Sequence, residues 1–131
     1  MKSFRDKPLQ ERKLAVYTIF KKYPDRIPVC VCKNKDTKTS SKLITSLLSS
    51  PSVDLPDIDK EKFLVPGDLT VGQFLYVIRR RIKLKPEEAL YIYFDGNLVN
   101  TGVTIKEVYN MYKDKDDMML YAVYSTENTF G

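Results

Sequence analysis

A run of seven apolar or aromatic residues, Met118–Tyr124, constrains the fold more than any other feature of this sequence. A strand that is hydrophobic at every position, rather than at alternate positions, has to be covered on both of its faces. The run is therefore expected to lie in the middle of a sheet, between other strands. It follows the charged stretch Lys113–Asp117, for which a solvated loop is expected. The rest of the chain has to supply the neighbouring strands and the covering helices.

Short apolar segments elsewhere supply the expected neighbours. Runs rich in β-branched and aromatic residues predict strands at Ile27–Cys32, Phe63–Pro66 and Leu90–Phe94. Asp95-Gly96 is a tight-turn signal, and a short edge strand is expected to follow it at Leu98-Val99.

Helical patterns separate these strands. In Leu9–Tyr23, apolar residues recur every three or four positions. Two further helices are predicted from capping boxes, one at Thr70 with Gln73 and one at Thr104 with Glu107. The order after the first helix is strand, strand, helix, strand, short strand, helix, strand. This order indicates an α+β protein with the β-grasp arrangement of ubiquitin.

The basic charge of the chain is confined to one segment. Residues 1–26 carry eight Lys or Arg and three Asp or Glu, whereas residues 27–131 carry 14 of each. We therefore divide the chain into a basic helical extension, 1–26, and a β-grasp domain, 27–131. Such a charge favours acidic partners or anionic lipid headgroups, and a well-solvated helix face explains it equally well. Because no nucleic-acid motif accompanies the charge, no nucleic-acid partner is expected.

A polar, Ser- and Thr-rich stretch separates the first two predicted strands. We expect a flexible loop inserted at about 35–53, and a short amphipathic turn at Ser41–Ser49 is the alternative. A tail, 125–131, is expected to follow the last strand.

The chain contains no histidine, and its two cysteines, Cys30 and Cys32, lie in a predicted strand. With so few ligands, no metal site and no cofactor are expected. An enzyme that uses either cysteine as a nucleophile is the least favoured hypothesis, so no catalytic residue is expected. The sequence has no apolar run long enough to span a membrane and no signal peptide, which predicts a cytoplasmic protein.

Several motifs in fixed order resemble one known family, the ubiquitin-like autophagy modifiers that include GABARAP and microtubule-associated protein light chain 3. The resemblance runs from about Phe4 to Gly131, with an interruption at 35–53. It implies a β-grasp with two additional N-terminal helices. The motifs are Asp25-Arg26-Ile27-Pro28-Val29, Asp57-Ile58-Asp59-Lys60, Phe63-Leu64-Val65-Pro66, Asp68-Leu69-Thr70-Val71-Gly72-Gln73-Phe74, Tyr76-Val77-Ile78-Arg79, Tyr112-Lys113-Asp114 and Glu127-Asn128-Thr129-Phe130-Gly131.

The resemblance implies conjugation to a lipid through Gly131. In this family, a cysteine protease exposes a terminal glycine, and activating and conjugating enzymes transfer it to the amine of phosphatidylethanolamine. Glycine suits a narrow enzyme channel because it has no Cβ. The implied locations are the cytoplasm and, for the lipidated form, the autophagosomal membrane. A non-conjugated adaptor that links vesicles or cargo to acidic partners such as the cytoskeleton is the alternative.

The resemblance also implies a docking site for aromatic-x-x-aliphatic peptides of cargo receptors, which add as a strand beside the second strand. Arg26 and Arg81 are expected to meet acidic peptide residues, and Tyr91, Ile92 and Tyr93 to form a second docking face. Core or sheet packing is the alternative role for the apolar members. The implied aromatic pocket comprises Ile19, Pro28, Cys30, Lys62, Leu64 and Met119, and the implied aliphatic pocket comprises Phe63, Val65, Pro66, Leu69, Phe74 and Val77.

Overall fold

The computed structural model of the chain describes residues 4–33, 61–85 and 87–126. The predicted insertion at 35–53, the alternative turn at 41–49 and residues 127–131, including Gly131, lie outside the described residues. The elements are, in chain order, the 3₁₀ helix η1 (Phe4–Asp6), α1 (Leu9–Lys22), β1 (Arg26–Lys33), β2 (Lys62–Pro66), α3 (Val71–Ile82), β3 (Tyr91–Phe94), α4 (Ile105–Tyr112) and β4 (Leu120–Ser125).

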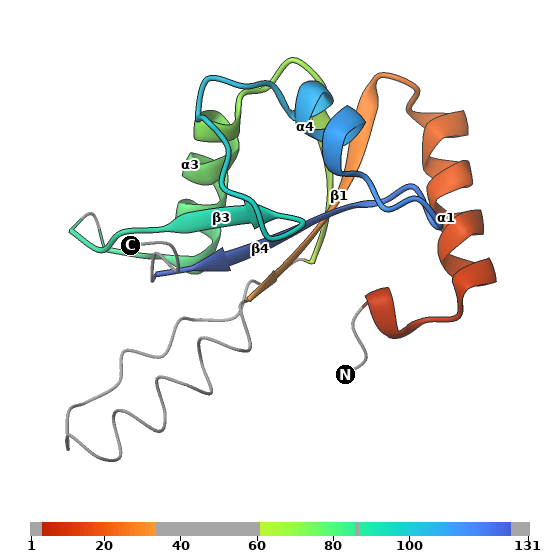
Figure 1. Cartoon of the computed structure of the whole chain (residues 1–131), viewed down its shortest axis with the longest axis horizontal. Helices are drawn as coiled ribbons and strands as arrows, with labels where there is room; N and C mark the ends of the chain where they lie inside the picture. The colour runs from red at the N-terminus through yellow and green to blue at the C-terminus, as the bar shows by residue number, and fades with distance from the viewer. Residues whose placement is uncertain (1–3, 34–60, 86, 127–131) are drawn as a thin grey trace, which may run out of the picture.

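The four strands form one mixed sheet in the order β2-β1-β4-β3 (Figure 1). β4 pairs in parallel with β1 and antiparallel with β3. It is therefore a central strand, as the apolar run Met118–Tyr124 predicted. The α+β class and the β-grasp arrangement are confirmed. Of the two N-terminal helices, the first is a three-residue 3₁₀ helix and the second is α1.

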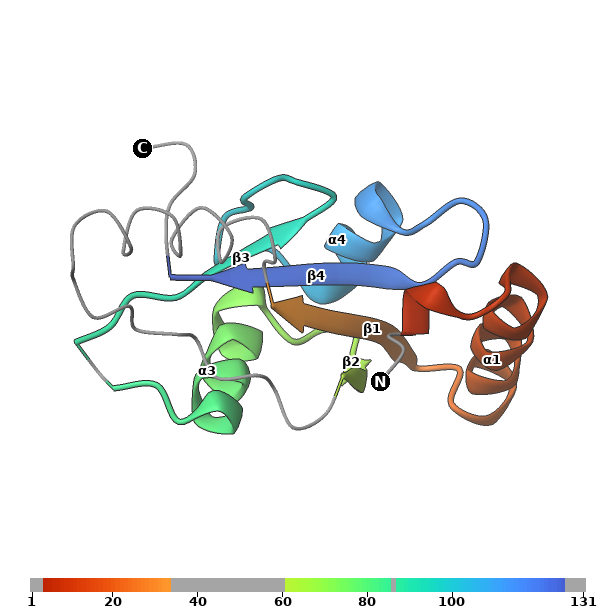
Figure 2. The same cartoon turned by 90° about the horizontal axis from the view of Figure 1, so that it is seen from below.

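The inner face of the sheet, which we define as the face that α3 and α4 cover, holds the main hydrophobic core (Figure 2). Both predicted capping boxes are confirmed, because Thr70 accepts a hydrogen bond from the Gln73 backbone and Thr104 accepts one from the Glu107 backbone. The caps satisfy backbone N–H groups that a helix leaves without partners at its N-terminus. The apolar side chains on one face of each helix, its apolar stripe, then pack against the sheet. The stripes comprise Val71, Phe74, Ile78 and Ile82 from α3, and Ile105, Val108 and Tyr109 from α4.

The opposite, outer face of the sheet is covered at one end by η1 and α1 (Figure 1). A smaller cluster of Phe4, Val16, Cys30 and Met119 is buried there. The predicted boundary between residues 26 and 27 falls within β1, which begins at Arg26. No helix in the described part of the chain is long and apolar enough to cross a membrane.

The prediction of an edge strand at Leu98-Val99 is wrong, because these residues form no strand. The hairpin after β3 ends at Asn97, which exchanges two backbone hydrogen bonds with Phe94 across the turn Asp95-Gly96. The chain then leaves the sheet because the carbonyls of Thr101 and Val103 accept hydrogen bonds from the first N–H groups of α3. Leu98-Val99 thus leads to a helix cap instead of a strand.

The prediction of a solvated loop at Lys113–Asp117 is wrong for its last residue, Asp117, which is buried. Asp117 is only 1 % exposed, and its carboxylate accepts hydrogen bonds from Arg12, from the Tyr121 hydroxyl and from the Met119 backbone. The expected strand also begins later than the apolar run. Met118 has a φ of +66°, which is outside the strand region, and β4 begins at Leu120.

Candidate functional site

β2 is one of the two edge strands of the described sheet, and its side chains alternate between two environments. Lys62 and Leu64 lie on the outer face and are exposed. Phe63 and Val65 point the other way, into the main core. One short strand therefore presents a charged and an aliphatic side chain to solvent on one face, and joins the core of the domain on the other.

The residues expected to form the aromatic pocket all lie on the outer side, at different depths. Pro28 and Cys30 are buried on β1, directly opposite Leu64 and Lys62. Ile19 is half-buried on α1, and Met119 is fully buried just before β4. The structure thus brings β1, β2, α1 and the start of β4 together around this region. The accessible members are Lys62, Leu64 and Ile19.

Phe4, for which no site was predicted, packs against the deep end of this group. Its ring is 2 % exposed and lies in one cluster with Val16, Cys30 and Met119. The Lys62 ammonium is 5.2 Å from the centre of the Phe4 ring, a distance typical of a cation–π contact. The backbone N–H of Phe4 donates a hydrogen bond of 2.9 Å to Glu61 Oε1. A lone phenylalanine in the charged start MKSFRDK was the available signal.

Of the residues expected to form the aliphatic pocket, Phe63, Val65 and Phe74 belong to the main core on the inner side. The rings of Phe63 and Phe74 pack edge to face, with 5.9 Å between their centres. Both rings are buried, and so is Val65. Pro66 and Leu69 are half-buried, and Val77 is 36 % exposed. Val77 also lines a shallow cavity of about 320 Å³ together with Tyr76, Arg80 and Arg81.

The two arginines expected to meet acidic residues lie at opposite ends of β2. Arg26 is exposed and stands opposite Pro66, the last residue of β2. The Arg81 guanidinium is 5.8 Å from the centre of the Phe63 ring, near the first residues of β2. With Lys62, these side chains surround the edge strand with positive charge.

The expected second docking face is split by the pleat of β3. Ile92 points into the main core and is 2 % exposed. Tyr93 is also buried, whereas Tyr91 is half-buried. Tyr91 is therefore the most accessible of the three side chains.

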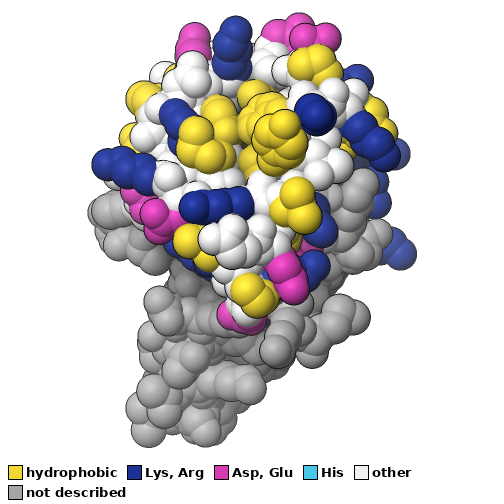
Figure 3. Space-filling view, turned by 90° about the vertical axis from the view of Figure 1, so that its right-hand side faces the viewer, with side chains coloured by type: hydrophobic (Ala, Val, Ile, Leu, Met, Phe, Trp, Pro, Cys, Tyr) yellow, Lys and Arg dark blue, Asp and Glu magenta, His cyan; other side chains and the backbone are white. Residues whose placement is uncertain are grey.

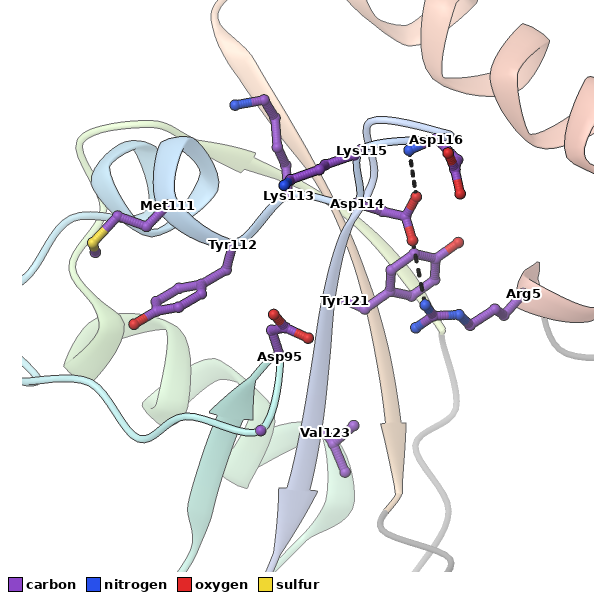
Figure 4. Close-up of a pocket in the computed structure, with 11 residues that line it drawn as sticks. Arg5, Asp95, Met111, Tyr112, Lys113, Asp114, Lys115, Asp116, Tyr121 and Val123 are labelled. Carbon is purple, nitrogen blue, oxygen red and sulfur yellow. Dashed lines mark hydrogen bonds and ion pairs between the residues drawn. The ribbon is translucent and has the colours of Figure 1, made fainter.

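A polar network joins the N-terminal segment to the loop before β4. The Arg12 guanidinium donates a 2.7 Å hydrogen bond to the Asp117 carboxylate, and burial together with the hydrogen bond to Asp117 raises the pKa of Tyr121. Arg5 lies 4.3 Å from the centre of the Tyr121 ring and forms a 3.3 Å ion pair with Asp114. Figure 4 shows Arg5 and Tyr121 beside a cavity of about 510 Å³ that also reaches Asp95 and α4.

The side of the molecule that carries α1 exposes hydrophobic side chains among many lysines and arginines (Figure 3). On α1 itself, Leu14 and Tyr17 are exposed, and the Lys21 ammonium lies 5.4 Å from the centre of the Tyr17 ring. Only Val16 of this helix is fully buried. The apolar residues of α1 thus lie partly on the surface and partly in the core.

The two cysteines are thiols on the outer face, and Cys30 is fully buried. The hydrogen bond with Cys32, burial and the nearby Glu61 carboxylate all raise the pKa of the Cys30 thiol. A raised pKa disfavours the thiolate that a nucleophile needs. Nothing in this geometry supports a catalytic cysteine.

Comparison with known proteins gives one consistent result. Residues 43–131 match the family model described as "Autophagy protein Atg8 ubiquitin like". The chain is 47% identical to "Autophagy-related protein 8" of Mycosarcoma maydis over 122 residues, which cover 93% of this chain and 89% of that protein. It is 44% identical to "Autophagy-related protein 8d" of Arabidopsis thaliana over 124 residues, covering 95% and 89% of the two chains. The crystal structure of Trypanosoma brucei ATG8 matches with a TM-score of 0.75 and 32% identity, over 97% of this chain and 95% of that one.

Proposed function

The chain belongs to the Atg8 family of ubiquitin-like autophagy modifiers, and on that premise we propose which of its residues carry lipid conjugation and receptor docking. The observation that carries the proposal is an identity of 44% to 47% with Atg8 proteins over more than nine-tenths of the chain. We assign lipid attachment to Gly131. We assign peptide docking to the edge strand β2 and the pockets on its two sides.

The docking proposal follows from strand geometry. A peptide that pairs with β2 continues the sheet, and its successive side chains point to opposite faces. In an aromatic-x-x-aliphatic motif the two anchors are three positions apart, so they point to opposite faces. The aromatic anchor then enters the outer side at Lys62 and Leu64, and the aliphatic anchor enters the inner side at Val77. The alternation of the β2 side chains between the outer face and the core, and the cavity beside Val77, support this proposal.

The outer pocket is shallow in this proposal. Phe4 packs on Cys30 and Met119 and so closes the deep end. An incoming aromatic ring therefore contacts Leu64, Ile19 and the edge of Pro28 rather than Met119 itself. Lys62, already over the Phe4 ring, lies above the entrance.

The base of the proposed inner pocket is formed by buried core side chains. Phe63, Val65 and Phe74 are buried in the core and supply packing beneath the anchor rather than mobile walls. The accessible walls that we propose are Val77, which is 36 % exposed, and the half-buried Pro66 and Leu69. Arg26 and Arg81 draw acidic peptide residues toward the two ends of β2, an attraction that weakens as salt rises. Tyr91 is the residue of the second docking face through which a different ligand would make contact.

Lipid attachment requires proteins other than this one. The partners that we propose are an activating enzyme, conjugating enzymes, a processing and deconjugating cysteine protease, and membranes that contain phosphatidylethanolamine. The chain is the conjugated substrate in that chemistry and supplies no catalytic group. Its proposed locations are the cytoplasm and the autophagosomal membrane.

Peptide docking is tested with a matched pair of leucines. Leu64 and Leu98 are 40 % and 39 % exposed, and only Leu64 lies on β2. We expect Leu64→Arg to weaken binding of a fluorescein-labelled, acid-flanked aromatic-x-x-aliphatic peptide at least about tenfold, since it removes an anchor contact worth more than about 1.4 kcal/mol. Leu98→Arg is expected to leave the affinity unchanged. Equal affinities for the two variants would refute the assignment of the docking site.

Conjugation is tested by reconstituted lipidation on phosphatidylethanolamine vesicles. The wild-type chain is expected to gain the lipid, which mass spectrometry detects at Gly131, and Gly131→Ala is expected to remain unmodified while still binding the peptide. Lipidation of Gly131→Ala would overturn the assignment. If neither protein is modified and both bind the peptide, the non-conjugated adaptor is favoured instead, and the basic segment 1–26 becomes the candidate contact for its acidic partner.

A further inference from the structure

We propose that Cys30, Cys32 and Glu61 form a binding site for a thiophilic divalent cation, zinc(II). Cys30 and Cys32 are two residues apart on β1 and therefore project from the same face of the strand. Glu61 immediately precedes β2, the strand that pairs with β1. One ligand atom from each residue, two sulfurs and one carboxylate oxygen, lies within 4.8 Å of the others. In the sequence, Glu61 is separated from the two cysteines by residues 33–60, so only the fold brings the third ligand to them.

The separations suit tetrahedral coordination. Zinc binds thiolate sulfur at about 2.3 Å and carboxylate oxygen at about 2.0–2.2 Å, so a sulfur and an oxygen on one zinc ion are about 3.5 Å apart. The Cys30 sulfur lies 3.4 Å from Glu61 Oε1. These two ligand atoms are therefore already at the separation that one zinc ion requires, and the Cys32 sulfur lies within 4.8 Å of both.

The backbone holds the three residues in place. Cys30 pairs with Lys62 in the β1–β2 ladder, and the Val31 N–H donates a 2.7 Å hydrogen bond to the Glu61 carbonyl. The Phe4 N–H donates to the same Glu61 Oε1 that faces the thiol. A hydrogen bond of this kind orients a ligating carboxylate, as outer contacts do in known metal sites.

The electrostatics also indicate a cation. Two thiolates and one carboxylate at this distance repel one another, and the protonated Cys30 thiol instead donates a hydrogen bond to Glu61. Three groups that become anionic so close together are therefore costly to ionise in the absence of a cation. A dication removes that cost: Zn²⁺ binds both sulfurs, and two protons leave to solvent.

The donor set selects the class of ion. Two thiolates favour zinc over magnesium or calcium, which prefer oxygen ligands. The described residues provide three ligands in this cluster, so a water molecule completes the tetrahedron. Cys32 and Glu61 are half-buried, which gives the ion a path from solvent. Bound zinc would join the start of β2 to β1 directly beneath Phe4.

The composition of the chain allows a metal-binding signal to be assigned to the two cysteines. With two cysteines and no histidine, any thiolate-to-metal charge-transfer band of the reduced, untagged, full-length protein has to come from Cys30 and Cys32. Titration with Co²⁺ as a spectroscopic probe is expected to give that band together with tetrahedral d–d bands, at one ion per chain. Titration with Zn²⁺ is expected to displace the Co²⁺ and to release about two protons per ion at a pH where the thiols are protonated.

Two variants and one control identify the ligands. Cys32→Ser is expected to abolish the charge-transfer band, and Glu61→Gln to lower zinc affinity at least about tenfold, the lower end of the losses seen for groups that support a metal site. Glu87→Gln, an exposed carboxylate outside the cluster, is expected to change neither. Circular dichroism verifies the fold of each protein. The absence of a charge-transfer band, or equal zinc affinity of the wild-type and Glu61→Gln proteins, would overturn the proposal.

Discussion

The two faces of the sheet are stabilised in different ways, although they share the same four strands. On the inner face, α3 and α4 pack through side chains such as Phe74 and Ile78, and the buried cluster is hydrocarbon and aromatic throughout. On the outer face, a small apolar cluster lies beside a buried carboxylate, Asp117, that binds Arg12. The inner face therefore maintains the fold, whereas the outer face holds the N-terminal segment over the proposed docking region, partly through contacts that depend on charge.

The largest effect is expected on the inner face. Phe74→Ala removes a ring that packs edge to face on Phe63 and is 1 % exposed, and we expect a loss of about 3–5 kcal/mol in the free energy of unfolding. Urea denaturation followed by circular dichroism measures it. Tyr76→Ala, on the exposed side of the same helix, is the control and is expected to cost less than about 0.5 kcal/mol. Similar losses in the two variants would remove the distinction between the faces.

An intermediate loss of stability is expected from a change in the polar network of Arg12, Asp117 and Tyr121 on the outer face. Asp117→Asn keeps an acceptor for the Met119 N–H but removes the charge that Arg12 binds, and we expect a loss of about 1–3 kcal/mol. Hydrogen exchange is expected to increase in η1 and α1 and to change little in α3. The exposed neighbour Asp116, changed to Asn, is the control. Increased exchange spread evenly over α3 and α1 would show that the two faces are not separable.

A smaller effect, with a characteristic pH dependence, is expected at Tyr109. Its hydroxyl donates a 2.7 Å hydrogen bond to the Met118 carbonyl, so Tyr109→Phe is expected to cost about 1 kcal/mol near neutral pH. Burial, followed by the Asp117 charge, raises the pKa of Tyr109 from 10.0 to about 12. The folded state therefore keeps the proton while the unfolded state loses it, and stability falls as pH rises from 10 to 12. We expect the stability difference between wild-type and Tyr109→Phe proteins to shrink over that range in urea titrations. A constant difference would contradict the raised pKa.

The smallest effect is expected at Arg5. Its side chain is 59% exposed in the ion pair with Asp114, and exposed pairs contribute at most about 1 kcal/mol. Arg5→Ala is expected to lower the unfolding free energy by less than about 0.5 kcal/mol at moderate salt. The difference is expected to vanish at 1 M NaCl, where screening acts over about 3 Å. A large, salt-independent loss would instead assign Arg5 a packing role.

Features that depend on neighbours in the chain were predictable from the sequence. The capping boxes at Thr70 and Thr104 involve residues three positions apart, and both are confirmed. The central position of β4 followed from its unbroken apolar run. Alternation along β2 is likewise a local property, which placed Lys62 and Leu64 on one face.

Features that depend on distant partners were not predictable. Asp117 is buried because Arg12 reaches it from α1, and nothing in the run Lys113–Asp117 distinguishes this aspartate from its neighbours. Leu98-Val99 resembles a strand, but hydrogen bonds to the start of α3 draw the following residues away. The contact of Phe4 with Cys30 and Met119 likewise joins segments that are far apart in sequence.

The parallel pairing of β1 with β4 has a consequence for synthesis of the protein on the ribosome. It aligns Val29 with Leu120 and Lys33 with Tyr124, so β1 emerges about 5–20 s before its central partner exists, at ordinary translation rates. β2 can pair with β1 during that interval, but the other edge of β1 stays open and β3 lacks its described neighbour. Open strand edges invite pairing with other chains. The nascent protein is therefore most vulnerable to aggregation just before β4 is translated, and a chaperone that shields β1 during that interval protects it most.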